Sequence, residues 1–473
     1  MADHSHTDIE SRLAKADMRS LIARYSIPGA IALVFFSIQS IVDGIIVGNY
    51  LGPDALASVS LIVPAYTIPS SIALILGIGS QAQMSIAMGE KDYLKAKTAL
   101  ITGAVSVITY AVIITLVFNT FPRQLAEFMG AEGDLFNASL DYIHGLMPFM
   151  GASLCYIFLD YMLKTLGYPR FSMVMVVTTI LMNIVLSVLF VTRFDLGTFG
   201  VGLATGVSIL TGCLISGSVV LKKLRSHPEL KIKKGKFSRK VLGRIFYNGS
   251  SEGVTEIAMG VTIVLFNFTF LRYAGKEGVA AFAVTNYIIF IGTSILLGVS
   301  DGSIPVISFN YGAKLWDRIR QGFKIVVKTN FIIGLIFLIL LWICGEYAIS
   351  MFLDNAASQT VIDMAVKGSR IMGFAFLLNG FNIFSGSFFT ALDNAKWSLV
   401  ISSCRGLVFI VMGITILPFM FGTEGIWLTV PFAELLTVFV GFYLLRRIVK
   451  KSYVKPEFKQ EHPMKISDFS SGR

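Results

Sequence analysis

Long apolar segments recur along the whole chain and are separated by short polar stretches. About twelve of them, each roughly 20 residues long, can cross the ~30 Å hydrocarbon core of a bilayer as a helix. They fall near residues 25–47, 56–78, 98–118, 135–159, 171–191, 199–221, 245–271, 279–304, 325–344, 371–392, 399–419 and 426–445. Strands of a membrane β-barrel would instead alternate apolar and polar positions over ~10 residues. The pattern therefore predicts an all-α integral membrane protein.

The apolar pattern is duplicated, with an offset of about 223 residues between the copies. The segment YLGPDALA at 50–57 corresponds to YAGKEGVA at 273–280, and MGEK at 88–91 corresponds to YGAK at 311–314. LGYPR at 166–170 likewise corresponds to LDNAK at 392–396. Six spans in each half make the halves run in the same direction, so the repeat predicts two pseudo-symmetric six-helix bundles around a central cavity.

We accordingly expect five regions along the chain. They are an N-terminal tail (1–20), an N-terminal bundle (21–222), a basic linker (223–240), a C-terminal bundle (241–447) and a C-terminal tail (448–473).

The composition is that of a membrane protein, and the positions of the basic residues indicate its orientation. Hydrophobic residues make up 54% of the chain and charged residues 15%, while the net charge is +11. With both termini in the cytoplasm, about 32 of the 40 Lys and Arg residues fall in tails and inner loops, as the positive-inside rule requires. Topology thus explains the charge, and we expect no nucleic-acid partner. The linker, with Lys231, Lys233, Lys234 and Lys236, reads as a solvated loop near anionic lipid, with specific lipid binding as the alternative.

Charged residues inside spans are the main candidates for function, because each costs about 2.5–3.5 kcal/mol at a helix centre. Asp43 has no basic residue within two helical turns. At 1.5 Å per residue it lies ~7 Å inside its span, and Asn183, Ser187 and Thr205 lie ~7–13 Å deep in the same half. These oxygens suit a hard monovalent cation, or a desolvated carboxyl that carries a proton. The alternative is that the three neutral side chains only bond neighbouring helices.

The second half has its own charge network. Glu252 and Glu256 are one helical turn apart and share a face. Arg405 enters its span to ~10 Å, and Glu256 and Glu434 lie nearer 18 Å, so a buried ion pair of Arg405 with either glutamate is expected. The functional alternative is that Glu256 titrates or receives a cationic substrate.

At these residues the chain resembles the multidrug and toxic compound extrusion (MATE) family, and its MepA-like bacterial branch in particular. The similar segments, in order, are VDGIIVGNYLG at 42–52, Asn183, GVGLAT at 200–205, GVSDGSIP at 298–305, FNYGA at 309–313, SSCR at 402–405 and GIW at 425–427. The resemblance implies a monomeric, multi-pass transporter of the bacterial cytoplasmic membrane that exports lipophilic, often cationic drugs. Inward H+ or Na+ would drive it, with no other cofactor.

The resemblance also assigns site residues. Asp43, Asn183 and Thr205 correspond to cation-coupling residues, and they would be the ligands if the ion is Na+. Ser187 stands where many members carry an aspartate, and Asn379 lies near the position of a tenth-span acid used by some relatives. Because Ser187 leaves the site one negative charge, H+ is favoured over Na+.

Other functions fit the sequence less well. A flippase for lipid-linked oligosaccharide, from the same wider superfamily, would share the two bundles but should line its cavity with several Arg and Lys residues, and here only Arg405 lies deep in a span. A channel would need a filter-like loop. An enzyme would need a metal-ligand cluster, a nucleotide loop or a nucleophile beside a base, and the sequence shows none, so we expect a protein that is not an enzyme.

Overall fold

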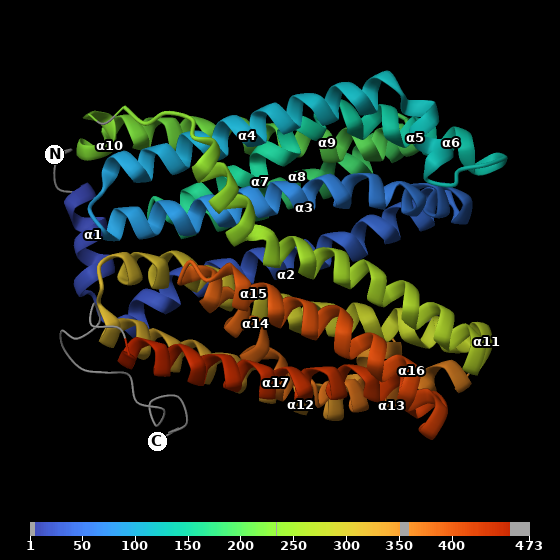
Figure 1. Ribbon diagram of the computed structural model, residues 1–473. Helices are drawn as coiled ribbons and strands as arrows, with labels where there is room; N and C mark the ends of the chain where they lie inside the picture. The colour runs from blue at the N-terminus through green and yellow to red at the C-terminus, as the bar shows by residue number, and fades with distance from the viewer. Residues whose placement is uncertain (1–4, 233, 351–358, 455–473) are drawn as a thin grey trace. The chain divides into compact units, whose positions relative to one another are not determined.

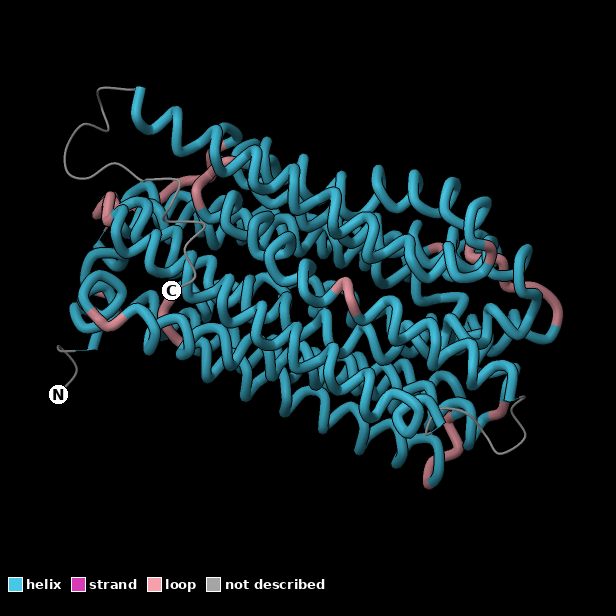
Figure 2. Tube along the Cα trace, turned by 90° about the horizontal axis from the view of Figure 1, so that it is seen from below, coloured by secondary structure: helices cyan, strands magenta, loops and turns pink. Residues whose placement is uncertain are grey.

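The computed structural model describes residues 5–232, 234–350 and 359–454, and within these ranges the chain consists of helices joined by short turns and loops, with no strand (Figure 2). Lys233 of the linker and residues 455–473 of the expected C-terminal tail lie outside the described residues. The first half contains α1 (Ser5–Lys15), α2 (Met18–Leu51), α3 (Pro53–Gly89), α4 (Tyr93–Thr120), α5 (Pro122–Phe128), α6 (Asp134–Leu146), the 3₁₀ turn η1 (Met147–Phe149), α7 (Met150–Thr165), α8 (Pro169–Thr192), α9 (Gly197–Ser226) and α10 (Pro228–Ile232) (Figure 1). The second half contains α11 (Arg239–Gly312), α12 (Trp316–Ser350), α13 (Gln359–Gly373), α14 (Phe376–Ala391), α15 (Ala395–Ser403), the π-helical turn η2 (Cys404–Val408), α16 (Phe409–Phe421) and α17 (Thr423–Val454).

Ten helical segments of the described chain are long and apolar enough to cross a membrane, which is fewer than the twelve expected. The difference comes from two places. The expected spans at 245–271 and 279–304 are two helices that meet at a kink at Gly275 (φ +63°, ψ −156°), and the label α11 covers both. The expected span at 371–392 is divided between α13 and α14, neither of which reaches 18 residues.

The duplication reappears in the backbone of the turns. Left-handed residues occur in matched pairs, each about 223–226 positions apart: Gly52 and Gly275, Lys91 and Lys314, Gly167 and Asp393, and Gly197 and Gly422. Positive φ is sterically costly for residues other than glycine. Its recurrence at equivalent positions shows that both halves use the same turns between the same helices.

The chain forms two compact units. The first comprises Met1–Lys15 and Ile31–Gly253, and the second comprises Ala16–Ala30 and Val254–Arg473. These bounds differ from those of the two bundles expected from the sequence, because α2 and α11 each contribute residues to both units. The expected tail and linker also contain helices, α1 and α10.

In the first unit, α9 packs against α6, α7 and α8, and α3 packs against α4, α6 and α7. Glycines permit the closest approach of α6 to α9. A Cβ on Gly145 would lie 2.3 Å from the carbonyl oxygen of Phe199, and a Cβ on Gly202 would lie 2.6 Å from that of Tyr142. This contact fixes the position of Thr205, one turn after Gly202.

In the second unit, α14 packs against α12 and α17, and α16 packs against α17. A Cβ on Gly334 would lie 2.2 Å from the carbonyl oxygen of Phe376, so α12 and α14 meet backbone to backbone. Phe266, Phe270, Phe282 and Trp427 form a buried aromatic cluster between α11 and α17, with centroids as close as 4.5 Å. These contacts hold the helices that carry the second charge network.

Candidate functional site

The first candidate site lies in the first unit, around Asp43 of α2. Asp43 is partly buried, and Gln39 precedes it by one helical turn and hydrogen-bonds its carboxylate. Gln39 Nε2 also lies 2.8 Å from Oδ1 of Asn183 in α8. Gln39 therefore bridges the acid and the amide, and the sequence analysis did not identify it.

The Asn183 side chain connects α2 to α9. It is 1% exposed, and its Nδ2 lies 2.9 Å from Thr205 Oγ1. An amide can rotate by 180° and exchange its oxygen and nitrogen. In the rotated orientation Nδ2 donates to Asp43 Oδ1 at 3.1 Å, and Oδ1 accepts from Thr205 Oγ1 at 2.9 Å and from the Thr205 backbone N–H at 3.2 Å. Asn183 thus contacts Asp43 and Thr205 in one continuous polar cluster.

Two further side chains border this cluster. Ser187 is fully buried one turn after Asn183, and its Oγ lies 3.5 Å from Asn183 Nδ2, at the outer limit of a hydrogen bond. Tyr142 of α6 is close enough to interact electrostatically with Asp43. The convergence expected for Asp43, Asn183 and Thr205 is present, while Ser187 lies at its edge.

The chemistry of the cluster follows from its single charge. One carboxylate is surrounded by amide and hydroxyl groups that can donate to it or accept from it. Such a set can hold a proton on Asp43, or offer Asp43, Asn183 and Thr205 oxygens to a hard cation. Groups of three or more His, Cys, Asp or Glu side chains that could bind a metal are absent from the described residues.

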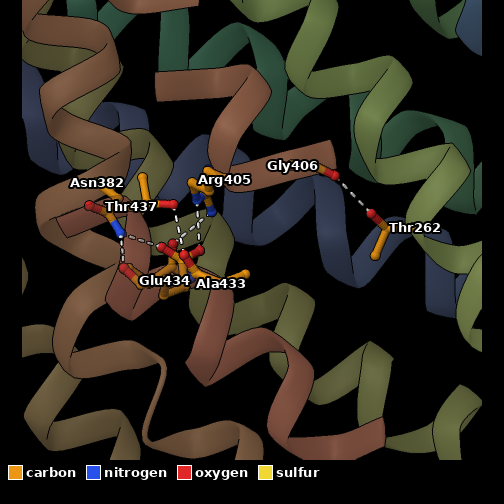
Figure 3. Close-up of polar contacts among 8 residues, drawn as sticks. Thr262, Asn382, Arg405, Gly406, Ala433, Glu434 and Thr437 are labelled. Carbon is orange, nitrogen blue, oxygen red and sulfur yellow. Dashed lines mark hydrogen bonds and ion pairs between the residues drawn. The ribbon is translucent and has the colours of Figure 1, made fainter. Parts of the chain in front are cut away.

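The second charge network lies in the second unit and is centred on Arg405 (Figure 3). Arg405 Nε donates to Glu434 Oε1 at 2.7 Å, and Arg405 Nη2 donates to Asn379 Oδ1 at 2.6 Å. Asn382 Nδ2 donates to Glu434 Oε2 at 2.6 Å, and Glu434 is only 4% exposed. Of the two partners expected for Arg405, the ion pair is made with Glu434.

The backbone around Arg405 is unusual. Arg405 lies in the π-helical turn η2, whose wider ring leaves carbonyl groups in need of other donors. Thr262 Oγ1 of α11 donates to the Gly406 carbonyl at 3.2 Å (Figure 3). A Cβ on Gly406 would lie 2.6 Å from Ala258 Cβ, so η2 rests directly on α11. The π-helical turn η2 shifts the register of the helix locally and places the Arg405 side chain toward Glu434.

The other acids of this half are placed apart from that ion pair. Glu256 is partly buried and interacts electrostatically with Asp301, whose Oδ1 accepts from Ser387 Oγ at 2.9 Å. Glu252 is partly buried one turn before Glu256, and the boundary between the two compact units falls between them. Glu256 therefore belongs to a separate acidic pair.

Comparison with known proteins gives the family. The MatE family profile matches residues 28–189 and again 253–415, which together are more than half of the chain. The chain belongs to the MATE family. The two matches begin 225 residues apart, in agreement with the duplication read from the sequence.

Relatives and solved structures agree with this assignment. The multidrug export protein MepA of Staphylococcus aureus is 23% identical over 91% of this chain and 95% of its own length. MepA of Staphylococcus saprophyticus is 23% identical over 89% and 93%. A crystal structure of a MATE protein in complex with MaL6 has a TM-score of 0.88 at 22% identity, covering 93% of this chain and 98% of that one. A MOP superfamily transporter from Pyrococcus furiosus, described as having reversed polarity of its binding pocket, has a TM-score of 0.86 at 22% identity over 93% and 97%. The protein is thus a multi-pass membrane transporter of the MATE fold.

Proposed function

We propose that this MATE protein is a secondary active efflux transporter that exports lipophilic, often cationic compounds in exchange for inward H+, with Na+ as the alternative ion. The observation that carries the proposal is the Asp43 cluster: one carboxylate inside a membrane span, bonded to neutral amides and bordered by hydroxyls. The MepA relatives are named multidrug export proteins, which supports the export of drugs. Both termini would be cytoplasmic, and the membrane would be the bacterial cytoplasmic membrane.

Asp43 is suited to coupling because its protonation changes which hydrogen bonds its neighbours can make with it. Ionised, Asp43 only accepts hydrogen bonds, and Gln39 and the rotated Asn183 amide both donate to it. Protonated, Asp43 gains an O–H donor, and Asn183 can accept it by turning Oδ1 toward α2. In that orientation Asn183 Nδ2 faces Thr205 Oγ1 at 2.9 Å and Ser187 Oγ at 3.5 Å. Asn183 would in this way link the protonation of Asp43 on α2 to the bonding of Thr205 on α9.

Transport would then proceed by alternating access of the two duplicated halves. A ligand or proton shifts a conformational equilibrium only by its difference in affinity for the two states. Protonation of Asp43 removes one charge from the membrane interior, where a charge costs about 2.5–3.5 kcal/mol on insertion scales. That difference would bias the equilibrium between the two conformations by roughly a hundredfold. The free energy for export would come from the inward H+ gradient.

Reconstituted vesicles test the proposal. Purified protein in liposomes receives a pH gradient or a Na+ gradient separately, and the movement of a fluorescent lipophilic cation is followed. We expect the pH gradient to drive dye movement and the Na+ gradient at fixed pH to leave it unchanged. Movement under Na+ alone would replace H+ with Na+ as the coupling ion. No dye movement under either gradient, together with flipping of a lipid-linked oligosaccharide, would overturn drug export in favour of a flippase.

A further inference from the structure

The basic linker between α9 and α11 is bound to the first unit. Lys97 Nζ of α4 donates to the Leu230 carbonyl at 2.6 Å, and the Ser238 backbone N–H donates to Thr102 Oγ1 of α4 at 3.2 Å. A Cβ on Gly235 would lie 2.7 Å from the Lys97 backbone, so the linker backbone lies directly against α4. The linker backbone is therefore held in place by α4, while Lys231, Lys234 and Lys236 stay exposed, as expected for a solvated face.

The inner face of the linker is buried. His227 and Leu230 are 6% and 1% exposed, and the Leu230 backbone N–H donates to His227 Nδ1 at 3.3 Å. The His227 ring lies against Tyr93, with centroids 6.0 Å apart. These contacts occupy one face of the linker and leave the opposite face outward.

The outward face is strongly basic. The exposed basic residues from the end of α9 to the start of α11 are Lys222, Arg225, Lys231, Lys234, Lys236, Arg239, Lys240 and Arg244. One acid, Glu229, occurs in the same stretch. Phe237 is 44% exposed in the middle of these charges. A fixed basic face with one apolar ring resembles an interfacial segment more than a surface that must stay in free solution.

The position of the linker in the chain indicates which molecules its outward face can contact. It follows the end of one membrane-spanning helix and precedes the start of another, so its side chains lie at the surface of the bilayer. Charges interact across about 10 Å at 0.1 M ionic strength, and lipid phosphates of that leaflet fall within this range. We propose that the outward face of residues 222–232 and 234–244 binds anionic lipid headgroups of the adjoining leaflet, with Phe237 seated in the interface.

Lipid binding to the purified full-length protein tests this proposal without reference to transport. The protein in neutral detergent is titrated with phosphatidylglycerol or phosphatidylcholine, and the rise in its thermal unfolding midpoint gives an apparent affinity. One variant carries Lys231→Gln, Lys234→Gln and Lys236→Gln. A matched control carries Lys314→Gln, Lys324→Gln and Lys396→Gln, three exposed lysines of the second unit.

We expect phosphatidylglycerol, and not phosphatidylcholine, to stabilise the unmodified protein and the control. The linker variant should bind phosphatidylglycerol at least about tenfold more weakly, since one lysine near an anionic surface contributes roughly fivefold. Equal affinity of the linker variant and the unmodified protein would overturn the proposal. Equal stabilisation by soluble heparin would also overturn it, because the face would then select polyanions in general.

Discussion

Removal of the Arg405 side chain should destabilise the second unit through the acid that it leaves behind. In the intact protein Arg405 bonds Glu434 and Asn379 at 2.7 and 2.6 Å, and its own side chain is 17% exposed. Arg405→Ala strands a carboxylate on a residue that is only 4% exposed, and Asn379 Oδ1 loses its charged donor. The loss is thus an unpaired buried charge as well as a missing contact.

The loss of stability in Arg405→Ala depends on the hydrogen bonds that Glu434 keeps. Breaking one side of a buried ion pair costs about 3–5 kcal/mol. Asn382 still donates to Glu434 Oε2, so the lower end of about 3 kcal/mol is expected. For a chain of 473 residues that loss lowers the midpoint of thermal unfolding by about 3 °C.

Thermal unfolding in detergent measures this loss, with Arg446→Ala as the control because Arg446 is an exposed arginine on α17. The double variant Arg405→Met with Glu434→Gln removes both charges and should regain at least half of the lost stability. If Arg405→Ala unfolds at the same temperature as Arg446→Ala, the ion pair contributes nothing and the reasoning is wrong. Failure of Glu434→Gln to compensate would show that Glu434 is not the stranded group.

Three further substitutions test other parts of the account. Gly249→Val should lower the unfolding midpoint of the first unit by several degrees, since a Cβ at 249 would lie 2.1 Å from the Ile75 carbonyl oxygen, and unchanged melting would contradict this packing. Ser187→Asp should shift the pH dependence of H+-driven transport or slow it by trapping a cation, whereas a rise in apparent Na+ affinity would indicate Na+ coupling. Burial raises the pKa of Glu10 in α1, so docking of α1 is strongest at pH below 4.5 and weakens as pH rises through the raised pKa. Hydrogen exchange in α1, corrected for intrinsic rates, should therefore show less protection at pH 8 than at pH 5, and Glu10→Gln should remove that difference.

The sequence predicted the spans well because continuous hydrophobicity over ~20 residues has one structural solution in a bilayer. It did not predict the break between α13 and α14. The two spans predicted on either side of Gly275 are separated there by a residue with positive φ. Between Gly373 and Phe376 the hydrophobicity stays high while the helix breaks.

The sequence could predict which site residues lie at the same depth in the membrane and which of them carry charge. Residues at one level of one bundle can meet, and Asp43, Asn183 and Thr205 do so. Gln39 was missed although its spacing of one helical turn before Asp43 was a usable signal. Arg405 pairs with Glu434 from within the π-helical turn η2, which widens the helix and shifts its register locally. Hydrophobic periodicity does not reveal such a shift, so the sequence could not decide between the two glutamates.

Asp43→Asn in reconstituted vesicles tests the central claim most directly. The substitution keeps the shape of the side chain and removes its titration, while Asp54→Asn changes an exposed acid of the same unit and serves as the control. We expect Asp43→Asn to fold, to retain the unfolding temperature of the unmodified protein within error, and to lose gradient-driven movement of the fluorescent cation. Near-normal gradient-driven transport by Asp43→Asn would contradict the assignment of Asp43 as the coupling carboxylate.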